Sequence, residues 1–324
     1  FHAPPLFEVI LPMAQKPEQL IYIQHCFQEL ARFKSKIFEH HRGKNTDYVH
    51  IIPLLEGVGD QIAIRSFLEK YIYLHQKRFG AKPKYLRPFL AHSDPALVSG
   101  TVTTVLANKI ALSEIEKFSQ AKNIPCYPII GVGSLIFRGG LNPENCRNFA
   151  TEYSGIRTVT IQSAFRYDYP LAKVKTAIAY FNKHLPGKRA QVISEIETKI
   201  LKNLVKKFDL VYQTTLTKII KDLEIFFEAV PSRRERRLHI GFLAYQRKLG
   251  KHHLPRAINF GAALYSLGVP PEFIGSGRLL AVLPEDERKL INKYYVNFLM
   301  DLKQAGRYLN KENLRLLAKN NSGW

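Results

Sequence analysis

Short apolar segments alternate with amphipathic stretches along the first 170 residues of this chain. The apolar segments, rich in β-branched and aromatic residues, lie at 7–11, 48–55, 85–91, 126–130 and 158–161. Between them, apolar residues recur every three or four positions, as on one face of a helix, at 19–40, 61–78, 102–120 and after Pro143. Strands that alternate with helices pair in parallel, because each helix returns the chain to the same end of the sheet. The sequence therefore predicts an α/β fold built from five strand–helix units.

The pattern changes after residue 170. Residues 172–184 and 191–227 have the periodicity of helices, 238–243 resembles a sixth strand, and the remainder is predicted to be helical. The sequence contains no internal repeat and no low-complexity linker. We therefore expect one domain over 1–324, a (β/α) barrel derived from the TIM barrel. Its strand–helix units occupy 1–170, and a mainly helical continuation with closing strands occupies 171–324.

Charge and cysteine content narrow the possible functions. The chain has 48 Lys and Arg against 27 Asp and Glu, a net charge of +21, which favours an anionic partner such as a phosphorylated substrate, nucleic acid or an acidic surface. The longest apolar stretch, 126–137, is too short to span a membrane. Cys26, Cys126 and Cys146 are widely spaced, which is typical of reduced thiols in a cytoplasmic protein.

Arginine and glycine residues follow the fourth and fifth predicted strands. The segment 131–140 contains four glycines and Arg138, and Arg166 follows the strand at 158–161. Glycines let backbone N–H groups approach an anion closely, and a guanidinium has the planar geometry of phosphate and carboxylate ligands. An α/β barrel has its active site at the carboxyl ends of its strands. These residues therefore predict an anion site at that end.

Carboxylates follow the second and third predicted strands. Glu56 and Asp94 would meet at the same end of a barrel, and hard oxygen ligands from two strands suit Mg²⁺ or Mn²⁺. The alternative for each residue is a helix N-cap or a salt bridge in a loop. For Asp94, which precedes Pro95, that alternative carries equal weight, since Asp-Pro commonly begins a helix.

Several long motifs indicate a family. The chain resembles archaeal-type phosphoenolpyruvate carboxylase over nearly its whole length, in FEVILPMA (7–14), SDPAL (93–97), IIGVGSLIFRGGLNPEN (129–145), TVTIQSAFRYDYP (158–170), LHIGFLAYQR (238–247) and the segment from LPRAI to GSGR (254–278). The resemblance implies a TIM-barrel-derived fold, Mg²⁺ or Mn²⁺, and a homotetramer. It also implies conversion of phosphoenolpyruvate and bicarbonate to oxaloacetate and phosphate.

The resemblance also implies roles for individual residues. Glu56 and Asp94 match the metal-binding carboxylates of the wider family. The substrate-binding and catalytic positions that we assign are Gly139, Gly140, Asn321 and Gly323, together with Arg138, Arg166, Arg233 and Arg256. Arg138 resembles the arginine of the family's substrate-binding loop. Arg233 and Arg256 resemble two further arginines that surround the phosphate and bicarbonate in bacterial and plant relatives. The tail 320–323 is similar to an Asn-Thr-Gly tail that completes the site.

The chain also departs from the family pattern. The family begins with a Ser-Thr-Gln-His-Pro-Asp-Asn segment whose histidine resembles the catalytic histidine of larger relatives, whereas this sequence begins at Phe1, close to FEVILP. Ile136 stands where the family usually has proline, and Gly57 follows Glu56. We therefore expect little or no carboxylase activity from the chain as given. We also expect the strand at 7–11 to be less well supported than the others.

Two other functions compete with the carboxylase interpretation. A basic nucleic-acid-binding protein would explain the net charge, although the sequence has no zinc finger, RNA-binding motif or obvious recognition helix. The arginine-rich run 233–237 is more typical of a solvated helix face. The second alternative is a non-catalytic barrel that serves as a subunit or effector-binding module.

Overall fold

The computed structural model describes residues 6–38, 49–231 and 247–324. Its first part alternates strands and helices. In chain order these are β1 (Glu8–Leu11), α1 (Pro17–Phe38), β2 (His50–Leu55), α2 (Val58–Ile62), α3 (Ile64–Phe79), β3 (Phe89–Ala91), α4 (Ser93–Ser99), α5 (Thr101–Lys122), β4 (Ile129–Gly131), the 3₁₀ helix η1 (Ile136–Arg138), α6 (Cys146–Glu152), β5 (Thr158–Val159), α7 (Ser163–Tyr167) and α8 (Leu171–His184).

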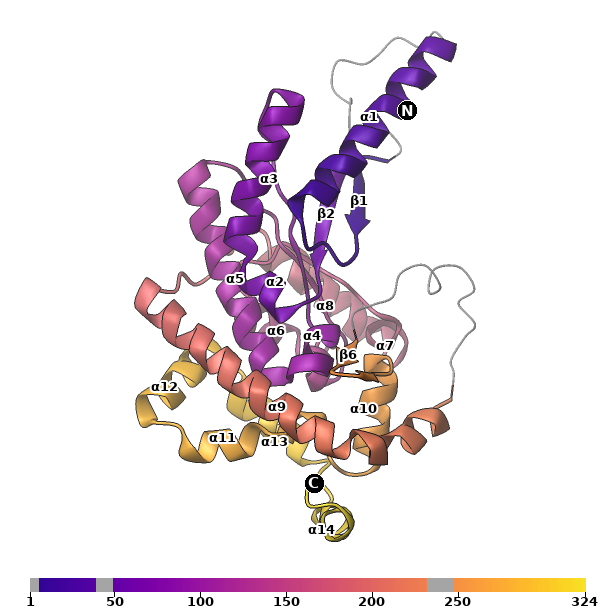
Figure 1. Ribbon diagram of the computed structural model, residues 1–324, viewed down its shortest axis with the longest axis vertical. Coiled ribbons are helices and arrows are strands. Elements are labelled where there is room, and N and C mark those ends of the chain that lie inside the picture. The colour runs from indigo at the N-terminus through magenta and orange to yellow at the C-terminus, as the bar shows by residue number, and fades with distance from the viewer. Residues whose placement is uncertain (1–5, 39–48, 232–246) are drawn as a thin grey trace.

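The second part is mainly helical, and it opens with the long helix α9. Its elements are α9 (Glu195–Ala229), the hairpin strands β6 (Lys248–Leu249) and β7 (His252–His253), α10 (Ala257–Ser266), the 3₁₀ helix η2 (Pro271–Phe273), α11 (Ser276–Val282), α12 (Glu285–Tyr294), α13 (Phe298–Gly306) and α14 (Lys311–Asn320). Helix α9 lies across the lower half of the molecule in Figure 1 and packs against α4 and α5 of the first part and against α10, α11 and α12 of the second. It therefore joins the two parts.

The five strands of the first part form one parallel sheet in chain order, β1-β2-β3-β4-β5. The predicted α/β fold with parallel strands is confirmed. Strands β3 and β4 are shorter than their apolar segments, because Pro88 and Pro128 have no N–H to donate to a ladder. An isolated bridge between Leu86 and Cys126 marks where the two segments approach again.

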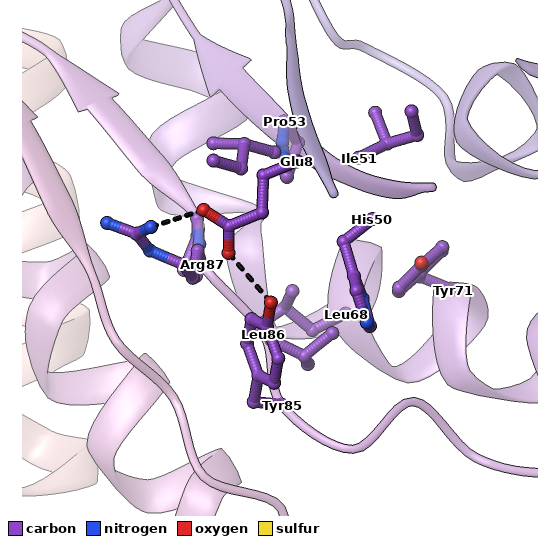
Figure 2. Close-up of a pocket in the computed structure, with 11 residues that line it drawn as sticks. Glu8, His50, Ile51, Pro53, Leu68, Tyr71, Tyr85, Leu86 and Arg87 are labelled. Atoms are coloured by element: carbon purple, nitrogen blue, oxygen red, sulfur yellow. Dashed lines mark hydrogen bonds and ion pairs between the residues drawn. The ribbon is translucent and has the colours of Figure 1, made fainter. Parts of the chain in front are cut away.

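The sheet is strongly curved, as a polar cluster at its amino end demonstrates. Figure 2 shows Arg87 and Tyr85 pointing at the Glu8 carboxylate, which accepts hydrogen bonds from Arg87 Nη1 (2.5 Å) and Tyr85 Oη (2.8 Å). Arg87 Nη2 also donates to Thr158 Oγ1 at 2.9 Å. Glu8 is on β1 and Thr158 on β5, which would be about 19 Å apart in a flat sheet. One guanidinium bridges both edges, so the sheet curls around this face.

Strand β1 is less buried than β2, β3 and β4. For these three strands, this confirms the expectation that the first strand is less well supported. Most residues of those three strands are buried, whereas those of β1 are half-buried or exposed, with Ile10 47% exposed. The short β5 is also half-buried. Both strands lie at edges of the described sheet, where backbone and side chains have a neighbour on one side only.

Two predicted elements differ from the structure. The helix expected at 61–78 is divided at Ala63 into α2 and α3. The region after 243 was expected to be wholly helical, which is wrong at the β6–β7 hairpin, because Gly250 takes a φ of +56° and turns the chain back. The strand expected at 238–243 lies outside the described residues. None of the helices that the structure describes is long and apolar enough to cross a membrane.

Candidate active site

Polar groups collect at the carboxyl ends of all five parallel strands. Loops or helices that follow β1, β2, β3, β4 and β5 supply, in that order, the Met13 backbone, Glu56, Asp94, Arg138 and Gln162. Parallel strands end at the same edge of a sheet, so five separate segments deliver these groups to one region. We call Glu56, Asp94, Arg138 and Arg247 the charged cluster.

Glu56 is held by the loop that follows β1. Its Oε2 accepts a hydrogen bond from the Met13 backbone N–H at 2.9 Å. Met13 has a φ of +51°, a left-handed conformation that is unfavourable for a residue with a side chain. The next N–H, of Ala14, donates to Leu54 O at 3.0 Å and ties the loop to the end of β2. The strained turn thus aims a donor at the carboxylate.

Asp94 lies in the first turn of α4, where it forms an ion pair. Its Oδ1 accepts from Arg247 Nε at 3.0 Å, and the side chains of Arg247 and Asp94 are 19% and 21% exposed. His92, not Asp94, is the N-cap residue of α4. Of the two alternatives that the sequence left open for Asp94, the structure therefore contains the salt bridge and not the cap.

The two carboxylates are close enough to repel each other. The pKa of Glu56 is raised to about 7, first by burial and then by the negative charge of Asp94, while the Met13 N–H and the charge of Arg247 oppose the rise. A cation that binds between two such carboxylates offsets their repulsion and stabilises the ionised form of both.

The residues present fit a magnesium-type ion. Mg²⁺ commonly takes one or two protein carboxylates and completes its coordination with water and substrate oxygens. Within 6–38, 49–231 and 247–324 the structure contains no group of three or more His, Cys, Asp or Glu residues arranged to hold a metal. Glu56 and Asp94 would therefore act as a pair and leave most coordination positions open.

Arg138 is positioned by the glycine-rich loop. Its Nε donates to Ser93 Oγ at 3.2 Å and its Nη2 to Gln162 Oε1 at 2.9 Å, so it links the segments after β3 and β5. Burial lowers the pKa of Arg138, and the charge of Asp94 opposes that change. A Cβ at Gly133 would lie 2.9 Å from Arg138 Cζ, so only glycine lets the guanidinium rest on the loop backbone.

The loop itself is anchored on both sides of Arg138. Phe137 is fully buried and stacks on Phe260 of α10 with ring centroids 5.5 Å apart. Gly139 has a φ of +106°, and a Cβ there would approach Val132 Cγ1 to 2.4 Å. Gly140, with a φ of +69°, donates its N–H to Leu135 O at 2.8 Å. The loop is thus preformed, which lowers the entropic cost of binding a ligand at Arg138.

Comparison with known proteins gives this geometry its context. A sequence model of the family described as phosphoenolpyruvate carboxylase matches residues 1–322. The chain belongs to the phosphoenolpyruvate carboxylase family. It is 42% identical to the phosphoenolpyruvate carboxylase of Leuconostoc mesenteroides over 99% of this chain and 63% of that protein. It is 43% identical to the phosphoenolpyruvate carboxylase of Oenococcus oeni over 100% of this chain and 64% of that protein. It is 36% identical to the phosphoenolpyruvate carboxylase of Metallosphaera sedula over 97% of this chain and 62% of that protein. The chain thus spans somewhat less than two thirds of these relatives, and the resemblance seen in its motifs is confirmed.

The other positions that the carboxylase resemblance singled out lie apart from the charged cluster in their described contacts. Arg166 is exposed on α7, 5.1 Å above the ring of Tyr167. Arg256 is exposed at the N-cap of α10, a helix that packs against α4. Arg233 lies outside the described residues. From the resemblance we also expect Arg138, Arg233 and Arg256 to converge on one anion, and this stays a prediction.

The C-terminal tail docks on α9. Asn321 Nδ2 donates to Lys218 O at 3.0 Å and to Asp222 Oδ2 at 2.8 Å, and Trp324 Nε1 donates to the same Asp222 oxygen at 2.9 Å. The Gly323 N–H donates to Asn321 Oδ1, and a Cβ at Gly323 would lie 2.7 Å from Lys218 Cβ. These contacts hold the tail in one place, but its predicted part in substrate binding remains a prediction.

Three contributors to the site were missed by sequence reasoning. Arg247 is the last residue of the LHIGFLAYQR motif, and its place in a family motif could have identified it as a site residue. Gln162 lies in the TVTIQSAFRYDYP motif, two residues after Thr160. The Met13 N–H is a backbone group, so no residue type could have identified it.

A second cluster of acids lies behind the glycine-rich loop. His92, Gly139, Glu152 and Asp301 are among the residues that line a small cavity between the loop and α13. Burial, with the charge of Glu152 adding to it, raises the pKa of Asp301 from 3.8 to about 7, although Tyr295 Oη donates to its Oδ2 at 2.7 Å. Ionising this carboxyl group therefore opposes folding.

Asp301→Asn should stabilise the protein at pH 8 but not at pH 4. Because the pKa of Asp301 is higher in the folded protein than in the unfolded chain, the cost of ionisation is absent below about pH 4, grows toward pH 7 and is complete above it. The pKa difference corresponds to about 4 kcal/mol, and partial solvent access reduces the expected gain to about 2 kcal/mol. Denaturant unfolding at pH 4 and pH 8 measures it; an equal effect at both values would contradict the assignment.

Proposed function

We propose that this chain carries the phosphoenolpyruvate- and metal-binding site of a phosphoenolpyruvate carboxylase, which forms oxaloacetate and phosphate from phosphoenolpyruvate and bicarbonate. One observation carries the proposal. In a member of this family, two mutually repelling carboxylates and a half-buried, preformed arginine lie together at the carboxyl ends of β2, β3 and β4. This is the combination that a metal ion and a phosphorylated anion would share.

The proposed reaction has two steps. An oxygen of bicarbonate attacks the phosphorus of phosphoenolpyruvate, which breaks the bond to the enol oxygen and gives carboxyphosphate and the enolate of pyruvate. Carboxyphosphate then releases CO₂ and phosphate, and the enolate carbon attacks CO₂ to form oxaloacetate. Both steps move negative charge between oxygens of bound anions. Fixed positive groups aimed at those oxygens accelerate such chemistry most.

Arg138 is the residue that we assign to the substrate anion. Ser93 and Gln162 hold its Nε and Nη2 and so fix the plane of the guanidinium before a ligand arrives. A fixed guanidinium stabilises charge in the transition state without reorganisation. Mg²⁺ or Mn²⁺, held by Glu56 and Asp94, would supply additional positive charge next to the substrate oxygens.

We further propose that the sheet is part of a TIM-type (β/α) barrel, within a single domain over 1–324. Two observations support a barrel: the strands are parallel and in chain order, and one guanidinium links β1 to β5 across the concave face. Side chains of alternate strands meet in this way inside TIM barrels. The homotetramer implied by the family resemblance and the cytoplasmic location indicated by the cysteines stay predictions.

Ligand binding is the direct test, since this chain spans less than two thirds of its relatives. With Mn²⁺ present, phosphoenolpyruvate at about 100 times its dissociation constant should stabilise the protein by about 2.7 kcal/mol, seen as a rise in Tm of about 4 °C. Pyruvate, which lacks the phosphate, is the matched control and should give no rise. Oxaloacetate formation, coupled to malate dehydrogenase with bicarbonate and Mg²⁺, tests the complete activity.

The outcomes separate the alternative functions. Protection by phosphoenolpyruvate supports our proposal, and we expect it even without oxaloacetate formation by this chain. If a version that also carries the Ser-Thr-Gln-His-Pro-Asp-Asn segment binds phosphoenolpyruvate but forms no oxaloacetate, the non-catalytic barrel is favoured. No protection, together with salt-dependent binding to DNA of random sequence, would favour a nucleic-acid-binding protein and contradict our proposal.

A further inference from the structure

The β6–β7 hairpin places Arg247 at Asp94, 153 residues away in the sequence. The residues next to the hairpin strands are paired, with the Leu254 N–H donating to Arg247 O at 2.8 Å. Leu249 and Leu254 are buried in the same apolar cluster as Phe137 and Phe260. The backbone of Arg247 is therefore anchored to the core that also anchors the substrate loop, and its guanidinium is held against Asp94.

The charge of Arg247 acts on both carboxylates. Its Nε donates to Asp94 Oδ1, and its positive charge opposes the rise in the pKa of Glu56. The charge of Asp94 in turn stabilises the positive form of Arg138. When all four groups are ionised, the charged cluster has two negative and two positive charges and is balanced without any ligand.

A divalent ion changes this balance. An ion bound by Glu56 and Asp94 would need the carboxylate oxygens, one of which Arg247 occupies. Two cations that share one carboxylate repel each other, so each weakens the hold of the other. With the ion present, the cluster would have an excess of two positive charges, which favours a multiply charged anion such as a phosphate ester.

We propose that Arg247 is the internal counter-ion of the metal site. It neutralises Asp94 while the divalent ion is absent, and it adds its charge to that of Arg138 at the anion site when the ion is bound. Metal binding would thereby create the site for the phosphorylated substrate. This inference rests on the proposed function, because it requires that Glu56 and Asp94 bind a divalent ion.

Manganese binding tests the inference without any need for turnover. Free Mn²⁺, measured by electron paramagnetic resonance during titration of the full chain, gives the affinity directly. Arg247→Gln removes the competing charge and should bind Mn²⁺ about tenfold more tightly without phosphoenolpyruvate. At saturating Mn²⁺ the same variant should bind phosphoenolpyruvate about tenfold more weakly. A purely structural role would not move the two affinities in opposite directions.

Matched variants isolate the charge. Arg247→Lys keeps a cation and should bind Mn²⁺ nearly as the unaltered protein does. Lys251→Gln removes the same charge from the exposed tip of the hairpin, where solvent and salt screen it, and should change neither affinity. If circular dichroism shows that Arg247→Gln is unfolded, Arg247→Met, which keeps the apolar stem, replaces it.

The failures are distinguishable. If the unaltered protein binds Mn²⁺ and Arg247→Gln binds it equally or more weakly, the counter-ion role is wrong while the metal site stands. If the unaltered protein does not bind Mn²⁺, the proposed metal site itself is wrong, and the inference fails with it.

Discussion

Asp94→Asn should weaken Mn²⁺ binding by about 100-fold or more while leaving the fold intact. The amide keeps the shape of the side chain and an oxygen that accepts from Arg247, but it removes one of only two anionic ligands in the charged cluster. Hard divalent ions bind carboxylates far better than amides, because most of the attraction is electrostatic. The loss should appear in the Mn²⁺ titration and in the disappearance of metal-dependent protection by phosphoenolpyruvate.

Asp94→Asn should also change the pKa of Glu56, which provides an internal check that the two carboxylates interact. The negative charge of Asp94 helps to raise the pKa of Glu56 to about 7, so its removal should lower that pKa. Asp286→Asn, on the exposed first turn of α12, is the matched control and should bind Mn²⁺ normally. An Asp94→Asn protein that is folded and binds Mn²⁺ as tightly as the unaltered protein would rule out Asp94 as a ligand.

Arg138→Ala should weaken phosphoenolpyruvate binding by about 100-fold. The side chain is half-buried, so its hydrogen bonds to a phosphate or carboxylate are only partly screened by solvent, and losing such a charged partner typically costs about 2–5 kcal/mol. Arg138→Lys should recover only part of the affinity, because an ammonium group cannot form two parallel hydrogen bonds to one anion. Isothermal titration calorimetry with saturating Mn²⁺ measures both.

Stability provides the control for Arg138. Burial of this charge opposes folding, so its removal should change the unfolding temperature without ligand only slightly. Arg147→Ala removes an arginine from the exposed face of α6, where it lies over the ring of Tyr180, and should not affect binding. Equal thermal protection by phosphoenolpyruvate with and without Arg138 would remove this residue from the substrate site.

The side chains of the charged cluster are held in place by contacts from several separate segments of the protein. The Met13 backbone orients Glu56, the β6–β7 hairpin places Arg247, and Ser93 with Gln162 orients Arg138. Glu56 and Arg138 are thus held by residues from other strand–helix units, and Asp94 by an arginine next to the hairpin. Such support restricts the motion of the charged groups, which is what preorganised electrostatic catalysis requires.

The sequence alone determined the alternation of strands and helices over the first 170 residues and the chemistry at the strand ends. The apolar periodicity over 7–11, 48–55 and 126–130 is local, and it predicted β1, β2 and β4 within a few residues. Glycines next to Arg138 indicated a tight loop for the same reason, since backbone conformations with positive φ are restricted to few residue types. The carboxylates Glu56 and Asp94 were found because parallel strands end at one edge.

Only the tertiary structure decided which of these groups meet and in what ionisation state. No local pattern could join Arg247 to Asp94 across 153 residues, or reveal that Arg87 ties β1 to β5. The pKa of Glu56 depends on burial and on a neighbouring charge, and both arise only when distant segments pack together. Local sequence fixes backbone preferences, whereas long-range packing sets distances and dielectric environment, and those two quantities control the strength of every charge in the site.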